Sequence, residues 1–236
     1  MINIKVKQDC CGCSACMQIC PKQSITMVTD NEGFLYPEVN NTTCIDCGLC
    51  EKVCPVLNQN DGSQPIEVYA AKNNNEQIRL KSSSGGIFTL LAEKIIAEGG
   101  VVFGAKFNTD WSVVHSYTET IDGLEDFRGS KYVQSSIGDN FLKAKQFLTD
   151  GRKVLFSGTP CQIAGLKHFL RKEYDNLLTI EVVCHGAPSP RVWKDYLEYR
   201  KERVYKKGKN TVSLSQNEMP QIVGIAFRDK TNGWQK

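Results

Sequence analysis

Residues 10–21 read Cys-Cys-Gly-Cys-Ser-Ala-Cys-Met-Gln-Ile-Cys-Pro, and residues 44–55 read Cys-Ile-Asp-Cys-Gly-Leu-Cys-Glu-Lys-Val-Cys-Pro. Counted back from each proline, three cysteines stand two residues apart and a fourth follows after three residues, so the two blocks share one spacing. Nine of the eleven cysteines of this 236-residue chain lie before residue 55, and Cys161 and Cys184 stand alone far downstream. The sequence therefore divides into a cysteine-rich start and a longer body.

The doubled spacing is typical of four-iron four-sulfur clusters. Three closely spaced thiolates hold three corners of a cuboidal cluster, and the fourth cysteine of the block points to the other cluster. This rule predicts one ligand set of Cys10, Cys13, Cys16 and Cys54 and a second set of Cys20, Cys44, Cys47 and Cys50. The register favours Cys10 over its neighbour Cys11, which either exchanges with Cys10 as ligand or is a small buried side chain.

Zinc is the alternative occupant, because pairs of cysteines two residues apart also bind zinc. Such zinc sites use two pairs for each ion and need neither a third cysteine at the same spacing nor a closing Cys-Pro. The blocks therefore favour clusters. Between them, residues 24–28 and 34–39 are expected to form two short strands joined by a turn, which gives an α+β ferredoxin-like two-cluster module over residues 1–60.

The body is expected to begin at residue 66, after a polar linker over residues 58–65. Extended segments and amphipathic helices then alternate. Strands are expected at residues 67–72, 101–107, 113–117, 153–156 and 177–183, and helices at residues 87–98, 139–150, 160–172 and 190–206. This alternation predicts an α/β domain with a mainly parallel sheet over residues 66–236.

Three turns of the body join an extended segment to a helix start, which is where α/β proteins bind ligands. Residues 82–86 read Ser-Ser-Ser-Gly-Gly and suit a phosphate group or simply cap a helix. Residues 157–161 read Ser-Gly-Thr-Pro-Cys and place Cys161 in a first helical turn, where a thiol pKa tends to be lowered. Residues 184–190 put Cys184 and His185 at the end of the next strand.

Two interpretations of these lone cysteines stay open, because buried structural cysteines are common at strand ends. If the two strands are neighbours, Cys161, Cys184 and His185 face one crevice; otherwise the thiols are structural. A further turn at residues 128–132, Arg-Gly-Ser-Lys-Tyr, either holds a phosphate or carboxylate or is a solvated loop.

Charge is unevenly spread along the chain. Residues 1–60 hold four Lys and six acids and so have a net charge of −2. The whole chain has a net charge of +3, so the residues after 60 carry a net charge of +5. This is either ordinary surface composition or a basic body that attracts a phosphate-bearing cofactor. The basic helix at residues 190–206 indicates a solvated face or a docking patch for an acidic partner, and not nucleic-acid binding. With no secretory signal and no long apolar run, we expect a cytoplasmic protein without a membrane span.

Taken together, these motifs resemble the beta-subunit family of coenzyme F-420 hydrogenases and dehydrogenases, over nearly the whole chain. The resemblance implies an iron-sulfur module that feeds an FAD-binding α/β domain, which exchanges hydride with a deazaflavin or another two-electron acceptor. It also implies flavin contacts from Ser83, Ser84, Gly85, Gly86, Arg128, Lys131, Gly158, Thr159 and Gln162. Cys161, Cys184 and His185 are expected near the reaction centre.

The expected activity is that of an iron-sulfur flavoprotein oxidoreductase with two 4Fe-4S clusters and FAD. Its partners would be a redox protein or a hydride-carrying small molecule. The alternative is a non-catalytic ferredoxin-type carrier subunit that docks a partner enzyme, and a third hypothesis gives Cys161 and Cys184 to another metal centre. Because members of the family commonly continue past the equivalent of Trp234, the chain is expected to be incomplete at its C-terminus.

Overall fold

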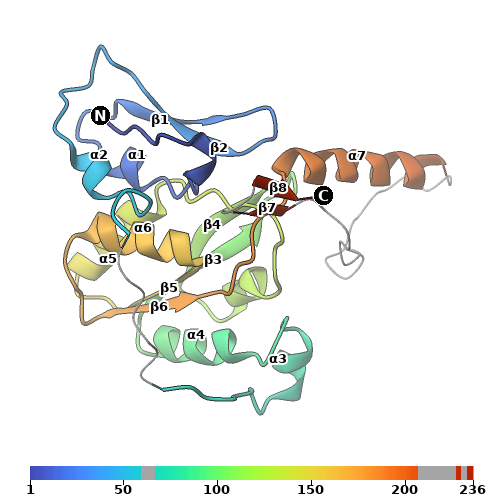
Figure 1. Cartoon of the computed structure of the whole chain (residues 1–236). Helices are drawn as coiled ribbons and strands as arrows, with labels where there is room; N and C mark the ends of the chain where they lie inside the picture. The colour runs from blue at the N-terminus through green and yellow to red at the C-terminus, as the bar shows by residue number, and fades with distance from the viewer. Residues whose placement is uncertain (60–66, 207–226, 230–232, 236) are drawn as a thin grey trace.

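The computed structural model of the chain describes residues 1–59, 67–206, 227–229 and 233–235. Its cysteine-rich start is a hairpin beside short helices (Figure 1). The elements are a 3-10 turn at Lys7–Asp9, α1 at Ala15–Ile19, β1 at Ile25–Thr29, β2 at Leu35–Val39 and α2 at Leu49–Lys52. β1 pairs antiparallel with β2, which confirms the predicted hairpin.

The body is built on a four-stranded sheet. Its strands are β3 at Val101–Phe107, β4 at Val113–Thr118, β5 at Val154–Gly158 and β6 at Leu177–Glu181, in the order β4-β3-β5-β6. β3, β5 and β6 are parallel, and β4 returns antiparallel to β3 at the edge because only a tight turn joins them. The sheet is therefore mixed and mostly parallel.

The strand expected at residues 67–72 is wrong. This segment has no regular secondary structure, and Val68 and Tyr69 are 84% and 78% exposed. The segment runs beside the glycine turn that precedes the helix beginning at Ile87, since Asn73 N–H donates to the Gly85 carbonyl over 2.6 Å. Alternating apolar residues favour a strand only where one face is buried, and here neither is.

Helices cover both faces of the sheet, with α5 and α6 on one side and α4 on the other (Figure 1). The helices of the body are α3 at Glu76–Leu80, α4 at Ile87–Ala97, a 3-10 turn at Asp122–Phe127, α5 at Asn140–Thr149, α6 at Pro160–Leu170 and α7 at Pro190–Lys206. Phe103 and Phe156 are buried against α5 and α6, whereas Val102 and Leu155 are buried beneath α4. Successive residues of a strand thus serve opposite layers. Near the chain end, β7 at Phe227–Asp229 pairs antiparallel with β8 at Gly233–Gln235.

The cysteine-rich module packs directly on α5 and α6. Cys13 and Ala15 belong to the same buried cluster as Phe141 and Leu166 of these helices. A Cβ at Gly165 of α6 would lie 3.0 Å from Cys13 Sγ, so a glycine is what lets the helix approach the module this closely. The two parts therefore share one apolar core, while the predicted domain boundary at residues 60–66 lies outside the described residues.

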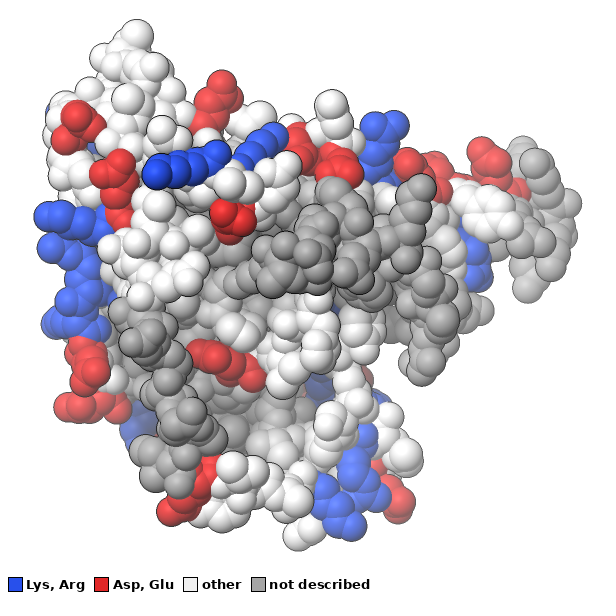
Figure 2. Space-filling view, in the orientation of Figure 1, with Lys and Arg blue, Asp and Glu red and all other residues white. Residues whose placement is uncertain are grey.

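Figure 2 shows charged side chains of both signs on this face of the molecule. Acidic and basic side chains lie side by side in its upper part, and further Lys and Arg gather at its left edge.

Candidate functional site

One cavity of the module gathers the first predicted ligand set. Its lining includes five cysteines, Cys10, Cys11, Cys13, Cys16 and Cys54, beside Ile2, Ile4 and Met27. Burial raises the pKa of Cys16 to about 12, with the neighbouring thiols of Cys10 and Cys54 adding to the effect. Cys54, from the second block, thus stands among cysteines of the first block, as the crossed pattern requires.

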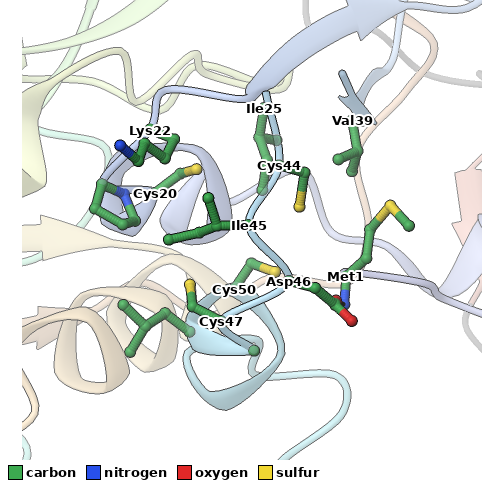
Figure 3. A pocket seen from close by; sticks show the side chains of 13 residues that line it. Met1, Cys20, Lys22, Ile25, Val39, Cys44, Ile45, Asp46, Cys47 and Cys50 are labelled. Atoms are coloured by element: carbon green, nitrogen blue, oxygen red, sulfur yellow. Dashed lines mark hydrogen bonds and ion pairs between the residues drawn. The ribbon is translucent and has the colours of Figure 1, made fainter. Parts of the chain in front are cut away.

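The second cavity gathers the other four predicted ligands (Figure 3). Its lining includes Cys20, Cys44, Cys47 and Cys50, and their sulfur atoms lie on several sides of a common space. Cys20 enters from the end of α1, where Ser24 N–H donates to its sulfur over 3.3 Å. Met1 and Ile45 also line this second cavity, and Ile45 is 57% exposed. This cavity therefore opens towards solvent.

Both cysteine loops have the same backbone conformation. Two residues after its first cysteine, each loop has a positive φ, of 65° at Gly12 and 49° at Asp46. Four residues after that cysteine the sign is positive again, at Ser14 and Gly48. Residues that alternate between right- and left-handed conformations turn successive N–H groups to one side, and such nests hold anions and iron-sulfur clusters. The two loops thus repeat one structure as well as one spacing.

The lining of the two cavities fits two four-iron four-sulfur clusters. The eight predicted ligands line two hollows, four to each, and a cuboidal cluster takes its ligands at separate corners.

Cys11 lines the same cavity as the first predicted ligand set and also contacts the body. Its thiol lies within hydrogen-bonding reach of Cys13 and of Cys161 in α6, and the contact with Cys13 is the main cause of its raised pKa. Cys161 lies in the first turn of α6, where its sulfur is 3.1 Å from Thr159 Oγ1. The sequence left Cys161 either in a crevice with Cys184 and His185 or as a structural cysteine, and the structure places it beside Cys11 of the module.

The serine-glycine turn and the cationic turn come together at the start of α4. Ser130 N–H donates to Ser83 Oγ over 2.6 Å, and Arg128 Nε donates to Thr89 Oγ1 of α4 over 3.3 Å. Gly86, with a φ of 76°, is the residue that precedes the first turn of α4. The free N–H groups of this turn are the groups that suit a phosphate.

The two glycines of this turn are held close to neighbouring backbone. A Cβ at Gly85 would lie 2.7 Å from the Ala71 carbonyl oxygen, which leaves no room for a larger residue. Ser84 lies between these glycines and Ser83, the residue that contacts the cationic turn, and the side chain of Ser84 is exposed. Burial lowers the pKa of Lys131 to about 8, and its Nζ donates to the carbonyls of Asp126 and Arg128.

The turn between β5 and α6 is held by a buried polar chain. Gln162 is 6% exposed, and its Oε1 accepts from Thr159 N–H while its Nε2 donates to Ser135 Oγ over 2.9 Å. Ser135 Oγ lies 2.9 Å from His115 Nδ1, and His115 Nε2 lies 3.0 Å from the Ser157 carbonyl. Since a carbonyl only accepts, Nε2 carries the proton and Nδ1 accepts from Ser135.

This arrangement changes the interpretation of Gln162. Its amide is fully engaged within the protein, so Gln162 positions the turn at Gly158 and Thr159. His115 and Ser135 belong to the same chain of hydrogen bonds, and the sequence pattern did not single out either of them. The available signal was a histidine on an alternating apolar strand, at the position of β4 where the side chain faces inward.

Cys184 and His185 follow β6, and β6 is the parallel neighbour of β5. Val182 N–H donates to the Gly158 carbonyl over 2.8 Å, so the two strand ends meet as expected. Cys184 itself is exposed, and its nearest polar contact is the Gly186 carbonyl at 3.7 Å.

Comparison with known proteins agrees with these features. Residues 151–219, which contain the β5–α6 turn and the Cys184 turn, match the family of the C-terminal region of the coenzyme F420 hydrogenase/dehydrogenase beta subunit. The later part of the body is therefore similar to these beta subunits. Residues 9–58 and 40–98 of the chain match two 4Fe-4S dicluster domain families, which supports the clusters.

Two curated proteins are similar to most of the chain. A coenzyme F420-dependent sulfite reductase from Methanocaldococcus jannaschii is 27% identical over 76% of this chain and 28% of its own length. A subunit of the F(420)H(2) dehydrogenase from Methanosarcina mazei is 22% identical over 74% of this chain and 53% of its own length. The chain thus spans about half or less of the length of these proteins.

A solved structure is also similar, the xenon-derivatized F420-reducing [NiFe] hydrogenase complex from Methanosarcina barkeri. Its TM-score is 0.44, with 15% identity over 67% of this chain and 55% of that chain. Among the described helices of the chain, none has the length and apolar character needed to cross a membrane.

Proposed function

We propose that this chain is the electron-transferring part of an iron-sulfur flavoprotein oxidoreductase. The observation that carries the proposal is the crossed lining of the two cavities, each with three predicted ligands of one block and the fourth predicted ligand of the other. Bound 4Fe-4S clusters supply one-electron carriers, and a bound FAD joins them to two-electron hydride chemistry. The residues of the chain would fix where each of these groups lies.

The cavity walls support an inner and an outer cluster. The cavity of Cys10, Cys13, Cys16 and Cys54 backs onto α6, where Cys13 packs against Gly165. The cavity of Cys20, Cys44, Cys47 and Cys50 faces outward, and Cys47 is exposed. We propose that a redox partner protein docks at the outer cavity and that the inner cavity serves the body of the chain.

The turn at the start of α4 is our proposed site for the flavin phosphates. Ser83, Ser84, Gly85 and Gly86 would offer backbone N–H groups, with Arg128 and Lys131 as the cations. Gly158 and Thr159 would contact the cofactor from the β5–α6 turn, held in place by Gln162. Cys184 and His185 remain proposed neighbours of the reacting atoms, at the end of β6.

The names of the relatives indicate the class of partner. They comprise an F420-dependent reductase, part of an F420H2 dehydrogenase and a hydrogenase complex. We therefore propose that the chain works within an assembly and that its hydride partner is a deazaflavin or a similar two-electron acceptor. A cytoplasmic location stays a prediction from the sequence.

One observation favours the second candidate, a carrier subunit without flavin. Lys131 already donates to two carbonyls of its own loop, and Arg128 donates to Thr89. A loop whose cations are engaged in this way is stable without a bound phosphate. Flavin content therefore separates the two candidate functions.

Iron, sulfide and flavin measured together on anaerobically purified protein test the proposal. About eight iron, eight sulfide and one FAD per chain are expected. Arg128→Ala should lose flavin and keep its iron, and the matched Arg152→Ala should keep both, because Arg152 pairs with Glu119 and Gly99 away from the turn. Full iron without flavin in the unmodified protein would replace the enzyme with the carrier, and iron near two per chain would overturn the clusters.

A further inference from the structure

Two cysteines that are not in either predicted ligand set meet across the interface between the module and the body. Cys11 lies in the first cysteine loop and Cys161 in the first turn of α6, 150 residues further along the chain. Their thiols lie within hydrogen-bonding reach of each other. Cys11 also borders the inner cavity, directly beside the ligand candidates Cys10 and Cys13.

The surroundings of the pair are fixed by contacts on both sides. Gln134 Nε2 donates to the Cys11 carbonyl over 3.3 Å, and Gln134 Oε1 accepts from Leu35 N–H over 3.4 Å. Gly12 has no space for a side chain, because a Cβ there would lie 2.7 Å from Gln134 Nε2. The loop that carries Cys11 is thus held against the body, and Thr159 Oγ1 contacts the sulfur of Cys161.

We propose that Cys11 and Cys161 form a disulfide that a small-molecule disulfide closes and that electrons from the neighbouring cluster sites reopen. In the closing step one thiolate attacks the small disulfide and releases one thiol, and the second cysteine then displaces the other thiol, so the two electrons lost by the cysteines reduce the small disulfide. Reopening the bond would take up two electrons, one from each reduced 4Fe-4S cluster, and two protons from water.

The direction of electron flow follows from typical potentials. Low-potential iron-sulfur clusters are stronger reductants than most protein dithiols. The clusters therefore reduce the disulfide rather than the reverse. The pair would thus store two electrons beside the inner cluster, at the surface where the module contacts the body.

Peptide mapping tests the bond without depending on flavin or on activity. Anaerobically purified protein is treated with cystine, alkylated and digested with trypsin without reduction. The expected product joins the peptide of residues 8–22 to the peptide of residues 154–167, which contains Cys161 as its one cysteine. The product should vanish in Cys11→Ser and in Cys161→Ser and persist in the control Cys184→Ser, whose cysteine lies in the peptide of residues 173–191.

Reductive titration tests the exchange with the clusters, and this second part rests on the proposed function. In a Cys184→Ser background, the cystine-treated protein should take up two more electrons per chain than the variant that also carries Cys11→Ser and Cys161→Ser, which has no thiol outside the predicted ligand sets to form a mixed disulfide, whatever its flavin content. Linked peptides without the extra two electrons would overturn the electron exchange. A protein with full iron that never links these peptides would overturn the disulfide, whereas a protein without iron that still links them would refute only the clusters.

Discussion

At the scale of single residues, the sequence position of a cysteine does not decide which cluster site it serves. Cys20 follows Cys16 by four residues, yet it lines the cavity of Cys44, Cys47 and Cys50. Cys54 makes the opposite crossing. The short helices α1 and α2 explain the exchange, because each carries the chain away from its own loop before the last cysteine of the block.

Replacing Cys20 with Ser should therefore damage the distant cluster. We expect about half of the iron to be lost, and iodoacetamide to label Cys44, Cys47 and Cys50 in the tryptic peptide of residues 23–52. The matched Cys54→Ser should instead expose Cys10, Cys13 and Cys16, in the peptide of residues 8–22. Labelling of the neighbouring block in either variant would contradict the crossed ligand sets.

At the scale of elements, a polar chain ties β4 to β5 and α6 through the centre of the body. His115 is 5% exposed, and burial lowers its pKa from 6.5 to about 4. Its Nδ1 accepts from Ser135, which in turn accepts from Gln162. A proton on Nδ1 would face a hydroxyl group that already donates to it, so the ring is stable in the fold only when neutral.

Acid should therefore weaken the folded state through His115. A lowered pKa means that the unfolded chain binds the proton first, so this contribution is present above pH 6.5 and is lost as the pH falls towards 4. Between pH 7 and pH 5 the free energy of unfolding should drop by about 2 kcal/mol on this account. Urea unfolding of His115→Gln should lack this share of the drop, and the exposed-site control His185→Gln should retain it. If the free energy of unfolding fell equally between pH 7 and pH 5 in the unmodified protein and in both variants, the role of His115 would be refuted.

The sequence predicts regular elements where burial and periodicity agree, and it fails where they do not. The cysteine spacing predicts the ligand sets because three of the four ligands of each cluster stand at fixed short spacings. The two short extended segments at residues 24–28 and 34–39 predict the hairpin of the module. The apolar runs at residues 101–107 and 153–156 predict β3 and β5, which are buried on both faces. By contrast, α3 was missed because it has no buried side chain, and the meeting of Cys11 with Cys161 depends on packing between parts that no spacing rule relates.

At the scale of the whole molecule, the module caps a helix of the body. Gln18 of α1 is 9% exposed, and its Oε1 accepts from the N–H groups of Phe141 and Leu142 in the first turn of α5. These N–H groups have no partner within the helix, so Gln18 supplies what a capping residue normally would. The other atom of this amide, Nε2, is buried without a partner among the described residues.

Gln18→Ala should loosen the module from the body. The loss of two hydrogen bonds at a helix start is expected to lower the free energy of unfolding by about 1–2 kcal/mol. Urea unfolding should show this as a lower midpoint, in protein that keeps its full iron content. Gln146→Ala is the matched control, because Gln146 lies on the exposed side of the same helix. If both variants had the same midpoint, the cap would contribute nothing to the joining of module and body.

The close approach of Gly165 to Cys13 has a consequence for heredity. A gene fusion that gave this body a different two-cluster module would supply working ligands. The new module would still have to fit three positions of the body, which are Gly165 beside Cys13, the start of α5 that Gln18 caps, and Gln134 beside Gly12. Descendants of one ancestral fusion should therefore change these positions in pairs. In this lineage the electron carrier and the body it serves would be inherited as a unit.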